Sequence, residues 1–378
     1  MDKLPSTQLA PNNATAQQES PLPSIISERC VHAIIETASC RRCVDACPTG
    51  AWLLDDDALN LDTAACDGCG LCIPACTEGA IYHRHEILVG EWQGITVAVC
   101  GCEKGGAVKH NVAEDAGIIP CIHAIGICDI LRLQQQGVTQ LLVSRGDCKQ
   151  CPRGGGIQLS QSVDTINSAQ QPAGHIALGL DYQPPDLWGQ IRRKIIAQAA
   201  RRPLSRRGFL SGLVNANLQS GIVRFTLSSG DEKPFVAPGK LFSQVTTATI
   251  WPYVPSIDAR LCNGCDACSR GCPHAAIVLE EINETFRYRV NAASCSGCHI
   301  CVDLCEVDAV KVAQWQRQIE GEVVLRRNRC RVCGNAFHRP HDPSQEPPQE
   351  HDSVCRICAK HNHYKNLFQV FGETETLA

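Results

Sequence analysis

The chain has 378 residues, a net charge of −4, and 44% hydrophobic but only 5% aromatic residues. This length predicts two to four domains, and so small a net charge favours no class of partner. The 26 cysteines could suggest a secreted disulfide scaffold, but they lie in tight C-x2-C groups that suit metal better than disulfides. We therefore expect reduced thiols and a cytoplasmic protein. Because no run of eighteen apolar residues occurs, no membrane span is expected.

The first segment, residues 1–27, is polar and rich in Pro, Gln and Asn. It lacks a basic region followed by an apolar stretch, so we expect no secretory signal and predict a disordered arm. The positions of the cysteines divide the rest of the chain into a first cysteine-rich module (28–88), an α/β cysteine-rich domain (89–157), a connector (158–250), a second cysteine-rich module (251–325) and a tail (326–378).

The first module contains two cysteine runs spaced for iron–sulfur clusters. In the run C-x2-C-x2-C-x3-C-P, three thiolates hold one cubane and the fourth reaches the other cluster. The second run fits this pattern, and with the last cysteine of the first run it predicts set 2: Cys66, Cys69, Cys72 and Cys47. The first run lacks its leading cysteine, because Thr37 occupies that position.

Cys30 is the natural substitute for the missing ligand. Residues 31–36 can form a helical excursion that returns Cys30 to the cluster. Set 1 is then Cys30, Cys40, Cys43 and Cys76. In the alternative, Cys30 is an ordinary buried thiol and the site holds a three-iron cluster. Pro48 ends the ligand loop, and Gly68 and Gly70 let the backbone turn closely.

The α/β domain is predicted from strands 95–99 and 138–143 and the helix 125–136 between them. Its cysteines follow the strands, at the edge where parallel sheets place ligands. We expect a fifth ligand set, for a [2Fe–2S] or [4Fe–4S] cluster. Its predicted members are Cys100, Cys121, Cys148 and Cys151, with Cys102 as an alternate. The alternatives are a zinc site or a metal-free domain with reactive cysteines. Cys128 is predicted to be a core thiol.

The connector contains no acidic residue from 187 to 230, and Leu187, Ile191 and Ile195 recur at helical spacing. A basic amphipathic helix is therefore predicted, which packs on its own domain or, alternatively, docks an acidic redox partner. We expect no nucleic-acid binding, because no binding fold accompanies the charge. Residues 205–210 (SRRGFL) imitate an export signal, but they lie far inside the chain and no long apolar run follows.

The second module carries the complete cysteine pattern twice. Set 3 is predicted to be Cys262, Cys265, Cys268 and Cys305, and set 4 is predicted to be Cys295, Cys298, Cys301 and Cys272. Strands are expected at 275–279 and 307–312, as in a ferredoxin-type βαβ repeat. A pair of zinc sites is the rejected alternative, because this spacing is not that of a zinc ribbon.

Both modules resemble the 2×[4Fe–4S] bacterial-type ferredoxins, duplicated here as in a polyferredoxin. The α/β domain, through Val99-Cys100, Pro120-Cys121 and Gly146-Asp147-Cys148-x2-Cys151, resembles the small iron–sulfur subunit of hydrogenases that pair with heterodisulfide reductase. The second module, with residues 205–210, is similar to ferredoxin-type proteins of periplasmic nitrate reductase systems. These resemblances imply partners of the hydrogenase, formate dehydrogenase, heterodisulfide reductase or molybdoenzyme kind.

The tail contains two C-x2-C pairs separated by 21 residues, a spacing typical of a structural zinc ribbon. The predicted zinc ligands are Cys330, Cys333, Cys355 and Cys358. A rubredoxin-like iron site or a further cluster is the alternative. The spare candidates are His338, His341, His351, His361 and His363.

The predicted fold class is α+β: two ferredoxin-like dicluster modules flank a small α/β domain, and a zinc-ribbon-like tail follows. Four [4Fe–4S] clusters, a fifth iron–sulfur cluster and a structural zinc are expected. The predicted function is single-electron transfer between larger redox enzymes. The first alternative is a maturation factor for an iron–sulfur or molybdenum enzyme, and the second is a thiol or sulfur redox enzyme. No catalytic triad, phosphate loop or dinucleotide motif stands out, so we expect no catalytic site and no small-molecule substrate.

Overall fold

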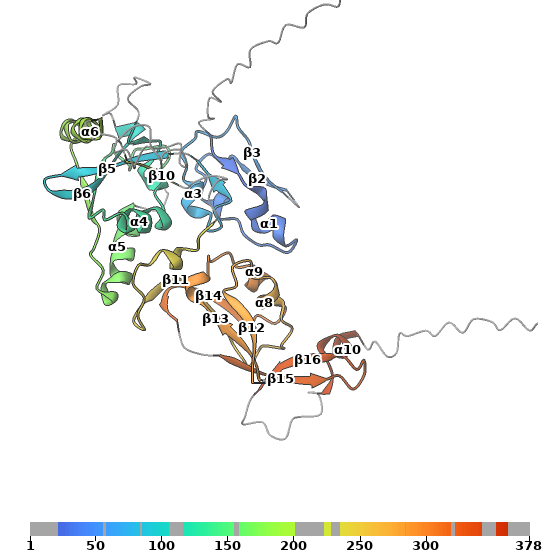
Figure 1. The fold of residues 1–378 in the computed structure, drawn as a ribbon. Helices are drawn as coiled ribbons and strands as arrows, with labels where there is room; N and C mark the ends of the chain where they lie inside the picture. Colours follow the sequence, from blue (N-terminus) through green and yellow to red (C-terminus); the bar gives the residue numbers. More distant parts are fainter. Residues whose placement is uncertain are drawn as a thin grey trace, which may run out of the picture.

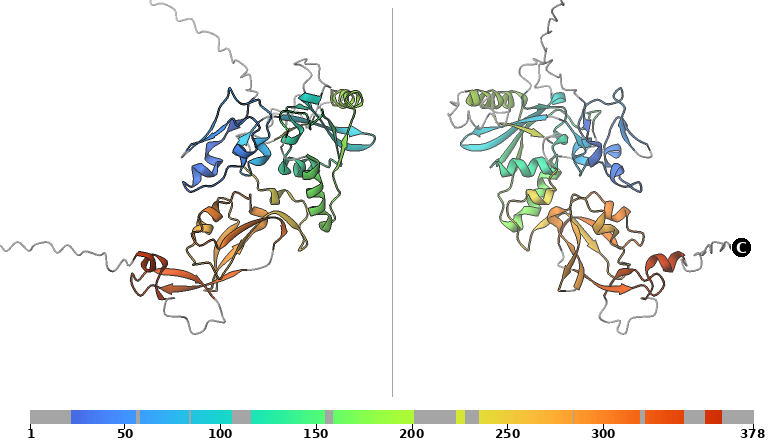
Figure 2. Two further views of the ribbon diagram at one scale, coloured as in Figure 1. Left: turned by 180° about the vertical axis from the view of Figure 1, so that it is seen from behind. Right: turned by 45° about the vertical axis from the view of Figure 1, so that its right-hand side comes forward.

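The computed structural model describes residues 22–55, 58–83, 85–105, 116–154, 159–200, 223–227, 235–283, 285–318, 322–341 and 353–361. Most of the predicted N-terminal arm and the motif at residues 205–210 lie outside these ranges. The described residues form three bodies, with the tail attached to the third (Figure 1). The first module and the α/β domain lie side by side, and the second module lies below both (Figure 2). Within these ranges no helix is both long and apolar enough to cross a membrane.

The first module is built from short elements around its cysteine loops. Its elements are β1 (Ser24–Ile25), α1 (Val31–Ile34), α2 (Arg42–Asp45), β2 (Trp52–Leu54), β3 (Leu59–Leu61), α3 (Cys72–Ala75) and β4 (Ile81–Tyr82). β1 pairs with β4, and β2 pairs with β3, both antiparallel. Trp52, Ile73 and Ile81 are buried against the cysteines of sets 1 and 2. The apolar side chains of this module therefore surround its ligand loops.

The α/β domain is organised around a six-stranded sheet. Its strands are β5 (His85–Trp92), β6 (Ile95–Cys102), β7 (Ile118–Ile119), β8 (Gln140–Ser144), β9 (Gly179–Tyr182) and β10 (Val223–Leu227). Their order is β10-β5-β6-β8-β9, with β7 also paired to β6. β6, β7, β8 and β9 are parallel, as expected, whereas β5 and β10 add an antiparallel edge that the sequence did not predict.

Helices cover both faces of this sheet. α4 (Ile127–Gln135) and α5 (Leu159–Gln170) pack on one face, and α6 (Pro185–Ala200) packs on the other. Trp188, Ile191 and Ile195 of α6 are buried against Val97 and Val99 of β6 and neighbouring apolar residues. A Cβ on Gly101 would lie 2.8 Å from the Trp188 ring, so this position needs glycine. Parallel strands require apolar cover on both faces, which α6 supplies.

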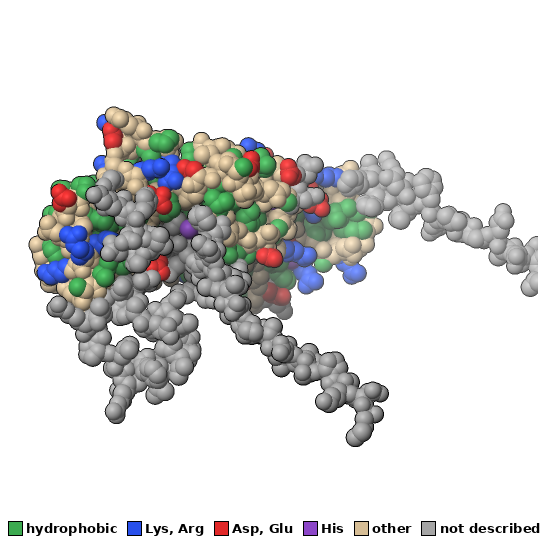
Figure 3. Space-filling model, turned by 90° about the horizontal axis from the view of Figure 1, so that it is seen from above, with side chains coloured by type: hydrophobic (Ala, Val, Ile, Leu, Met, Phe, Trp, Pro, Cys, Tyr) green, Lys and Arg blue, Asp and Glu red, His purple; other side chains and the backbone are tan. Residues whose placement is uncertain are grey.

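The predicted connector at 158–250 is therefore corrected. α5, β9, α6 and β10 all belong to the α/β domain, because they complete its sheet and its two covering layers. The basic helix packs on its own domain, the simpler of the two expectations. Arg193 and Lys194 of this helix are exposed, whereas Nε of Arg192 donates to the carbonyl oxygen of Ala116 at 2.7 Å. Lys and Arg side chains gather at one end of the molecule (Figure 3). Lys194 also lies over the Trp92 ring, 4.7 Å from its centre.

The second module has two sheets. β11 (Ile250–Ile257) pairs with β14 (Val310–Arg317), and a second sheet has the order β12-β13-β15-β16. The bounds of its other elements are α8 (Ala267–Arg270), β12 (Ile277–Ile282), β13 (Thr285–Val290), α9 (Ile300–Asp303), β15 (Val323–Arg329), β16 (Ala336–Pro340) and α10 (Arg356–His361). Short 3-10 helices connect the elements of all bodies: Ser27–Arg29, Glu103–Gly105, Ile122–Ala124, Gln171–Ala173, Pro238–Leu241 and Ala292–Ser294.

The predicted boundary between the second module and the tail, after residue 325, falls inside β15. β15 pairs with β13 of the module on one side and with β16 of the tail on the other. The boundary is corrected accordingly, because the tail strands continue the sheet of the module. They cover an edge of β13 that would otherwise expose unpaired backbone groups.

Candidate metal centres

Set 1 is brought together in space, including Cys30. Its four cysteines, Cys30, Cys40, Cys43 and Cys76, line one cavity. The pKa of Cys43 is raised to about 12, first by burial and then by the neighbouring thiols of the other three set 1 cysteines. His32 links the helical segment that follows Cys30 to the loop of Cys40: its Nε2 lies 2.7 Å from the carbonyl oxygen of Cys40. α1 is thus the short helix that returns Cys30 to the position Thr37 leaves without a thiol.

Set 2 lies on the other side of the same module. Burial raises the pKa of Cys72 to about 12, and the thiols of Cys69, Cys47 and Cys43 also raise it. Cys66 begins the same loop, where its backbone N–H donates to the carbonyl oxygen of Asp62 at 3.1 Å. The crossed pairing predicted for Cys47 agrees with these neighbours. Cys43 of set 1 is also close enough to influence Cys72, so the two sets are adjacent.

The cysteines predicted for sets 3 and 4 lie near one another in two groups. Burial raises the pKa of Cys268 to about 12, and the thiols of Cys262, Cys265 and Cys305 contribute in the same direction. Burial likewise raises the pKa of Cys301, and the neighbouring thiols that add to it are Cys298, Cys295, Cys272 and, from set 3, Cys268. Cys272, Cys295, Cys298 and Cys301 also line one small cavity. Each last cysteine therefore joins the other half of its module.

The loops that lead into these sets share a left-handed turn. Asp266 and His299 have φ values of 63° and 69°, at the position that Gly70 occupies in the first module with 76°. A Cβ on Gly297 would lie 2.4 Å from the Tyr253 ring, and Gly297 itself has a φ of 78°. Left-handed φ and close approach both favour glycine. These left-handed turns therefore let the backbone curve closely around a bound ligand.

A repeated backbone hydrogen bond, which the sequence reasoning missed, supports the four crossing cysteines. In each case the N–H of an alanine four residues later donates to the Sγ, at 3.2 or 3.3 Å. The pairs are Ala51–Cys47, Ala80–Cys76, Ala276–Cys272 and Ala309–Cys305. Hydrogen bonds to ligand sulfur stabilise the thiolate and influence the reduction potential of an iron–sulfur site. The recurring Cys-x3-Ala pattern was the signal available in the sequence.

Set 5 requires a correction. The thiols that neighbour Cys121 are Cys102, Cys148 and Cys151, and Cys102 in turn is close to Cys148 and Cys151. Cys100, the member first preferred, is fully buried inside the sheet. Cys102 lies two residues after Cys100, at the C-terminal end of β6. The loops that follow β7 and β8 at this edge of the sheet carry the other three cysteines. The alternate ligand therefore has the better position. Cys128 lies in α4 and packs against the core of the α/β domain, as predicted.

The tail cysteines form a compact tetrad of Cys330, Cys333, Cys355 and Cys358, whose sulfur atoms all lie within 4.8 Å of one another. The Sγ atoms of Cys333 and Cys355 are 3.8 Å apart. A tetrahedral site with Zn–S bonds of about 2.3 Å needs sulfurs about 3.8 Å apart, so the tetrad fits one zinc ion.

The thiols of the tetrad differ in their pKa values: burial and the three neighbouring thiols raise the pKa of Cys358 to about 12, whereas hydrogen bonds favour the thiolate of Cys330 although burial opposes it. The backbone N–H groups of Cys355, Cys333 and Val332 donate to the Cys330 sulfur and lower the pKa of Cys330 to about 6. Among the spare histidines, His338 contacts Asp266, with Nδ1 3.2 Å from a carboxylate oxygen of that residue. His351 and His363 lie outside the described residues. Four thiols thus suffice for this site.

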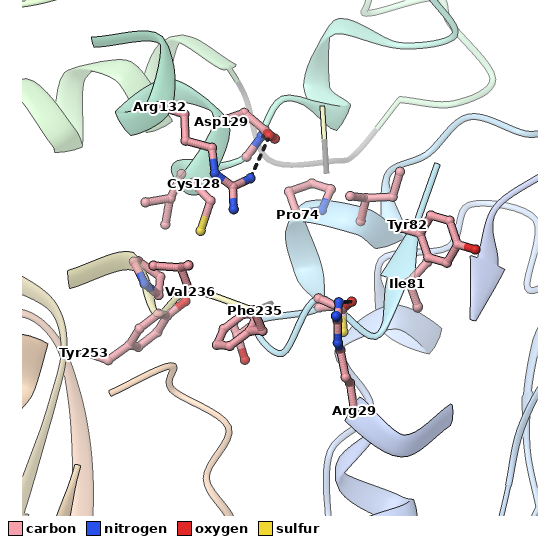
Figure 4. A pocket seen from close by; sticks show the side chains of 17 residues that line it. Arg29, Pro74, Ile81, Tyr82, Cys128, Asp129, Arg132, Phe235, Val236 and Tyr253 are labelled. Carbon is pink, nitrogen blue, oxygen red and sulfur yellow. Dashed lines mark hydrogen bonds and ion pairs between the residues drawn. The ribbon is translucent and has the colours of Figure 1, made fainter. Parts of the chain in front are cut away.

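The first module, the α/β domain and the second module meet at a pocket (Figure 4). Cys128, Asp129 and Arg132 reach it from α4, and Pro74 and Ile81 reach it from α3 and β4. Phe235 and Val236, which precede β11, and Tyr253 in β11 of the second module also line the pocket. Elements of all three bodies therefore line one pocket, and Cys76 of set 1 lies in its lining.

Two matches to family models follow the same cysteine loops. Residues 261–309 match a 4Fe-4S dicluster domain, and residues 59–82 match a 4Fe-4S binding domain. The chain thus carries two ferredoxin-type 4Fe–4S domains. The first range contains every cysteine of sets 3 and 4, and the second contains four cysteines of the first module.

Two curated proteins are similar to part of the chain. One is a pyruvate dehydrogenase [NADP(+)] from Cryptosporidium parvum, 27% identical over 161 residues that cover 33% of this chain. The other is the mitochondrial pyruvate dehydrogenase [NADP(+)] of Euglena gracilis, 26% identical over 182 residues that cover 39% of this chain. The chain spans only 8% and 10% of the length of these relatives.

Proposed function

We propose that the protein is a polyferredoxin that passes single electrons between larger redox enzymes. Iron–sulfur clusters held by thiolates supply one-electron transfer when they are bound. The observation that carries the proposal is the position of Cys298: this set 4 cysteine lines the same cavity as all four cysteines of set 1. The ligand loops of two separate modules therefore meet, which a chain built for electron transfer requires.

The residues of the chain have three tasks in this function. The thiols of sets 1 to 4 would hold four [4Fe–4S] clusters, and set 5, with Cys102, Cys121, Cys148 and Cys151, would hold a fifth. The backbone N–H groups that point at sulfur stabilise thiolate charge. Buried apolar residues, such as Trp52 beside sets 1 and 2 and Ile277 beside sets 3 and 4, exclude water from the ligand loops. The tail tetrad would hold a structural zinc that takes no part in electron transfer.

The partners proposed from the sequence resemblances are a donor and an acceptor of the hydrogenase, formate dehydrogenase, heterodisulfide reductase or molybdoenzyme kind. The two similar proteins, whose names denote pyruvate dehydrogenases that use NADP(+), add a 2-oxo acid oxidising enzyme to the donors worth testing. A cytoplasmic location remains part of the proposal, because metal-bound thiolates suit a reducing compartment.

The test is electron transfer by the full chain, purified without oxygen and analysed for iron. A reduced candidate donor is mixed with the protein in a stopped-flow instrument, and bleaching near 400 nm is followed. A candidate acceptor is then added. We expect reduction and reoxidation at rates that match the turnover of the partner enzymes.

One outcome would favour the maturation factor instead. In that case the protein would be needed while the partner enzyme is synthesised, and removing it from a mature assay would leave partner activity unchanged. Reduction that is slow against partner turnover, together with such a dependence on synthesis, would overturn the electron-transfer proposal.

A further inference from the structure

A buried contact between Glu78 and His274 joins the two ferredoxin-type modules. Nε2 of His274 lies 2.6 Å from Oε2 of Glu78, and Glu78 is only 5% exposed. The two residues occupy the same position in their loops, each two residues after a crossing cysteine: Cys76 of set 1 and Cys272 of set 4. The pair therefore ties a ligand loop of one module directly to a ligand loop of the other.

Two further groups of contacts at this junction accompany the Glu78–His274 pair. The Phe235 ring packs on the His274 ring, with centres 4.9 Å apart, and a Cβ on Gly79 would touch Phe235 at 3.3 Å. In the second group, the backbone N–H and the hydroxyl of Ser39 donate to the Asp303 carboxylate at 3.0 and 2.7 Å. Ser39 precedes Cys40 of set 1, and Asp303 lies between Cys301 of set 4 and Cys305. Both contacts again join the loops of sets 1 and 4.

A second buried contact joins the first module to the α/β domain. Arg153 is 8% exposed; its Nε donates to Oδ2 of Asp67 at 2.5 Å and its Nη1 donates to the carbonyl oxygen of Pro120 at 2.8 Å. Asp67 lies between two cysteines of set 2, and Pro120 precedes Cys121 of set 5. Cys69 and Cys121 pack together with Leu71 in one buried cluster. Set 5 is therefore next to set 2.

We propose that the five cysteine sets form one row in the order 5–2–1–4–3, and that Glu78 and His274 are the positioning residues at its central joint. The inference rests on the proposed function and adds the order of its sites. Passing one electron from one set to the next oxidises the first site and reduces the second, and makes or breaks no bond. The α/β domain and set 3 are then the two ends where partners exchange electrons.

The order has a physical basis in each neighbouring pair. Sets 2 and 1 share the core of the first module, and sets 4 and 3 share that of the second. The joint between sets 1 and 4 depends on contacts between the two ferredoxin-type modules, since Cys298 lines the cavity of set 1 together with Glu78. The joint between sets 5 and 2 likewise depends on contacts between the first module and the α/β domain. Glu78 also places a buried negative charge between sets 1 and 4. Negative charge near an iron–sulfur site disfavours its reduced form.

The experiment uses the full chain, loaded with clusters, fully reduced with dithionite and studied by electron paramagnetic resonance. Neighbouring reduced clusters interact magnetically, which broadens or splits their signals. We expect interaction signals in the native protein, and we expect Glu78→Gln to weaken them without loss of iron. The matched control is Glu280→Gln, which breaks the Glu280–Arg289 pair inside the β12–β13 hairpin. The control should leave the spectrum unchanged.

A redox titration separates positioning from general destabilisation. Glu78→Gln should raise the reduction potentials of the sites in sets 1 and 4 and leave those of sets 2 and 3 unchanged. Asp303→Asn weakens the contact with Ser39 at the same joint and leaves the Glu78–His274 pair in place. It should therefore also weaken the magnetic interaction signals.

Two results would overturn the proposed order. One is a native spectrum that is the simple sum of isolated sites. The other is a Glu78→Gln protein that retains its iron but matches the Glu280→Gln control in spectrum and potentials. Neither result removes the proposed function, because loaded clusters could still exchange electrons with partners singly; stopped-flow reduction by the donor tests that separately.

Discussion

The hydroxyl of Tyr288 donates a hydrogen bond to Oδ1 of Asp266 at 2.6 Å, and the backbone N–H of Asp266 points back at the same hydroxyl at 3.2 Å. Asp266 directly follows Cys265 of set 3 in the chain. Its carboxylate also faces Nδ1 of His338 in β16. One buried aspartate thus ties a ligand loop to the module's sheet and to the tail. Burial, together with the hydrogen bond to Asp266, raises the pKa of Tyr288 well above its usual range, so its hydroxyl remains a donor.

Replacing Tyr288→Phe should destabilise the second module by about 1–3 kcal/mol, because a buried carboxylate loses a hydrogen-bond donor. The measurement is the thermal unfolding midpoint of the loaded protein without oxygen. The control is Arg260→Gln, which removes an exposed partner of Asp258 and should leave the unfolding midpoint nearly unchanged, because solvent screens exposed charge pairs. Equal midpoints for the two variants would contradict the role of the Tyr288–Asp266 pair.

Cys30→Ser should lower the iron content by at least one atom per chain, because set 1 would lose its fourth thiolate. Its matched control is Cys128→Ser, a buried thiol in α4 outside every set, which should retain all iron. Iron analysis of both proteins after anaerobic reconstitution gives the result. If Cys30→Ser binds as much iron as the native chain, the three-iron alternative for set 1 is favoured.

The α/β domain offers a test between two neighbouring thiols of β6. Native protein should bind more iron than the sixteen or so atoms that four [4Fe–4S] clusters account for. Cys102→Ser should remove that excess, whereas Cys100→Ser should keep it, because Cys102 is the residue beside Cys121, Cys148 and Cys151. The opposite ranking would restore Cys100 as the ligand, and no excess iron in the native protein would exclude a fifth cluster.

The tail should bind one zinc ion per chain. Cys355→Ser should abolish this zinc, since only three thiolates would remain around a site that needs four. His341→Ala should leave the zinc content unchanged, because four thiols already complete the tetrad. Metal analysis by mass spectrometry distinguishes the elements. One iron in place of zinc would indicate the rubredoxin-like alternative.

Local spacing made most of the ligand sets predictable. The ligand cysteines recur at short, regular spacings in the sequence, so the eight cysteines from Cys262 to Cys305 could be divided into two crossed sets from the sequence alone. The sequence also proposed Cys30 for the place that Thr37 leaves without a thiol, and Cys30 lines one cavity with Cys40, Cys43 and Cys76. The strand at 95–99 and the helix at 125–136 followed from their apolar patterns, and β6 and α4 lie there.

Other features depended on distant pairing. α6 was placed in a connector because its basic residues dominate the local sequence, yet Trp188, Ile191 and Ile195 bury it on the sheet. β15 pairs with β13, more than thirty residues earlier in the chain, and no local sequence pattern predicts that pairing. Cys100 and Cys102 face the same side of β6, so alternation could not choose between them.

By itself, the sequence determined that this protein is a chain of iron–sulfur modules, because cluster ligation is set by short thiol spacing that local backbone geometry alone can satisfy. Only the tertiary structure decided how the modules meet. Glu78 and His274 are 196 residues apart, and Asp67 and Arg153 are 86 apart. Such pairs form only when folded surfaces pack together and remove charged groups from water. The proposed order of the sites along the molecule therefore depends on how the modules pack together and not on the spacing of cysteines in the sequence.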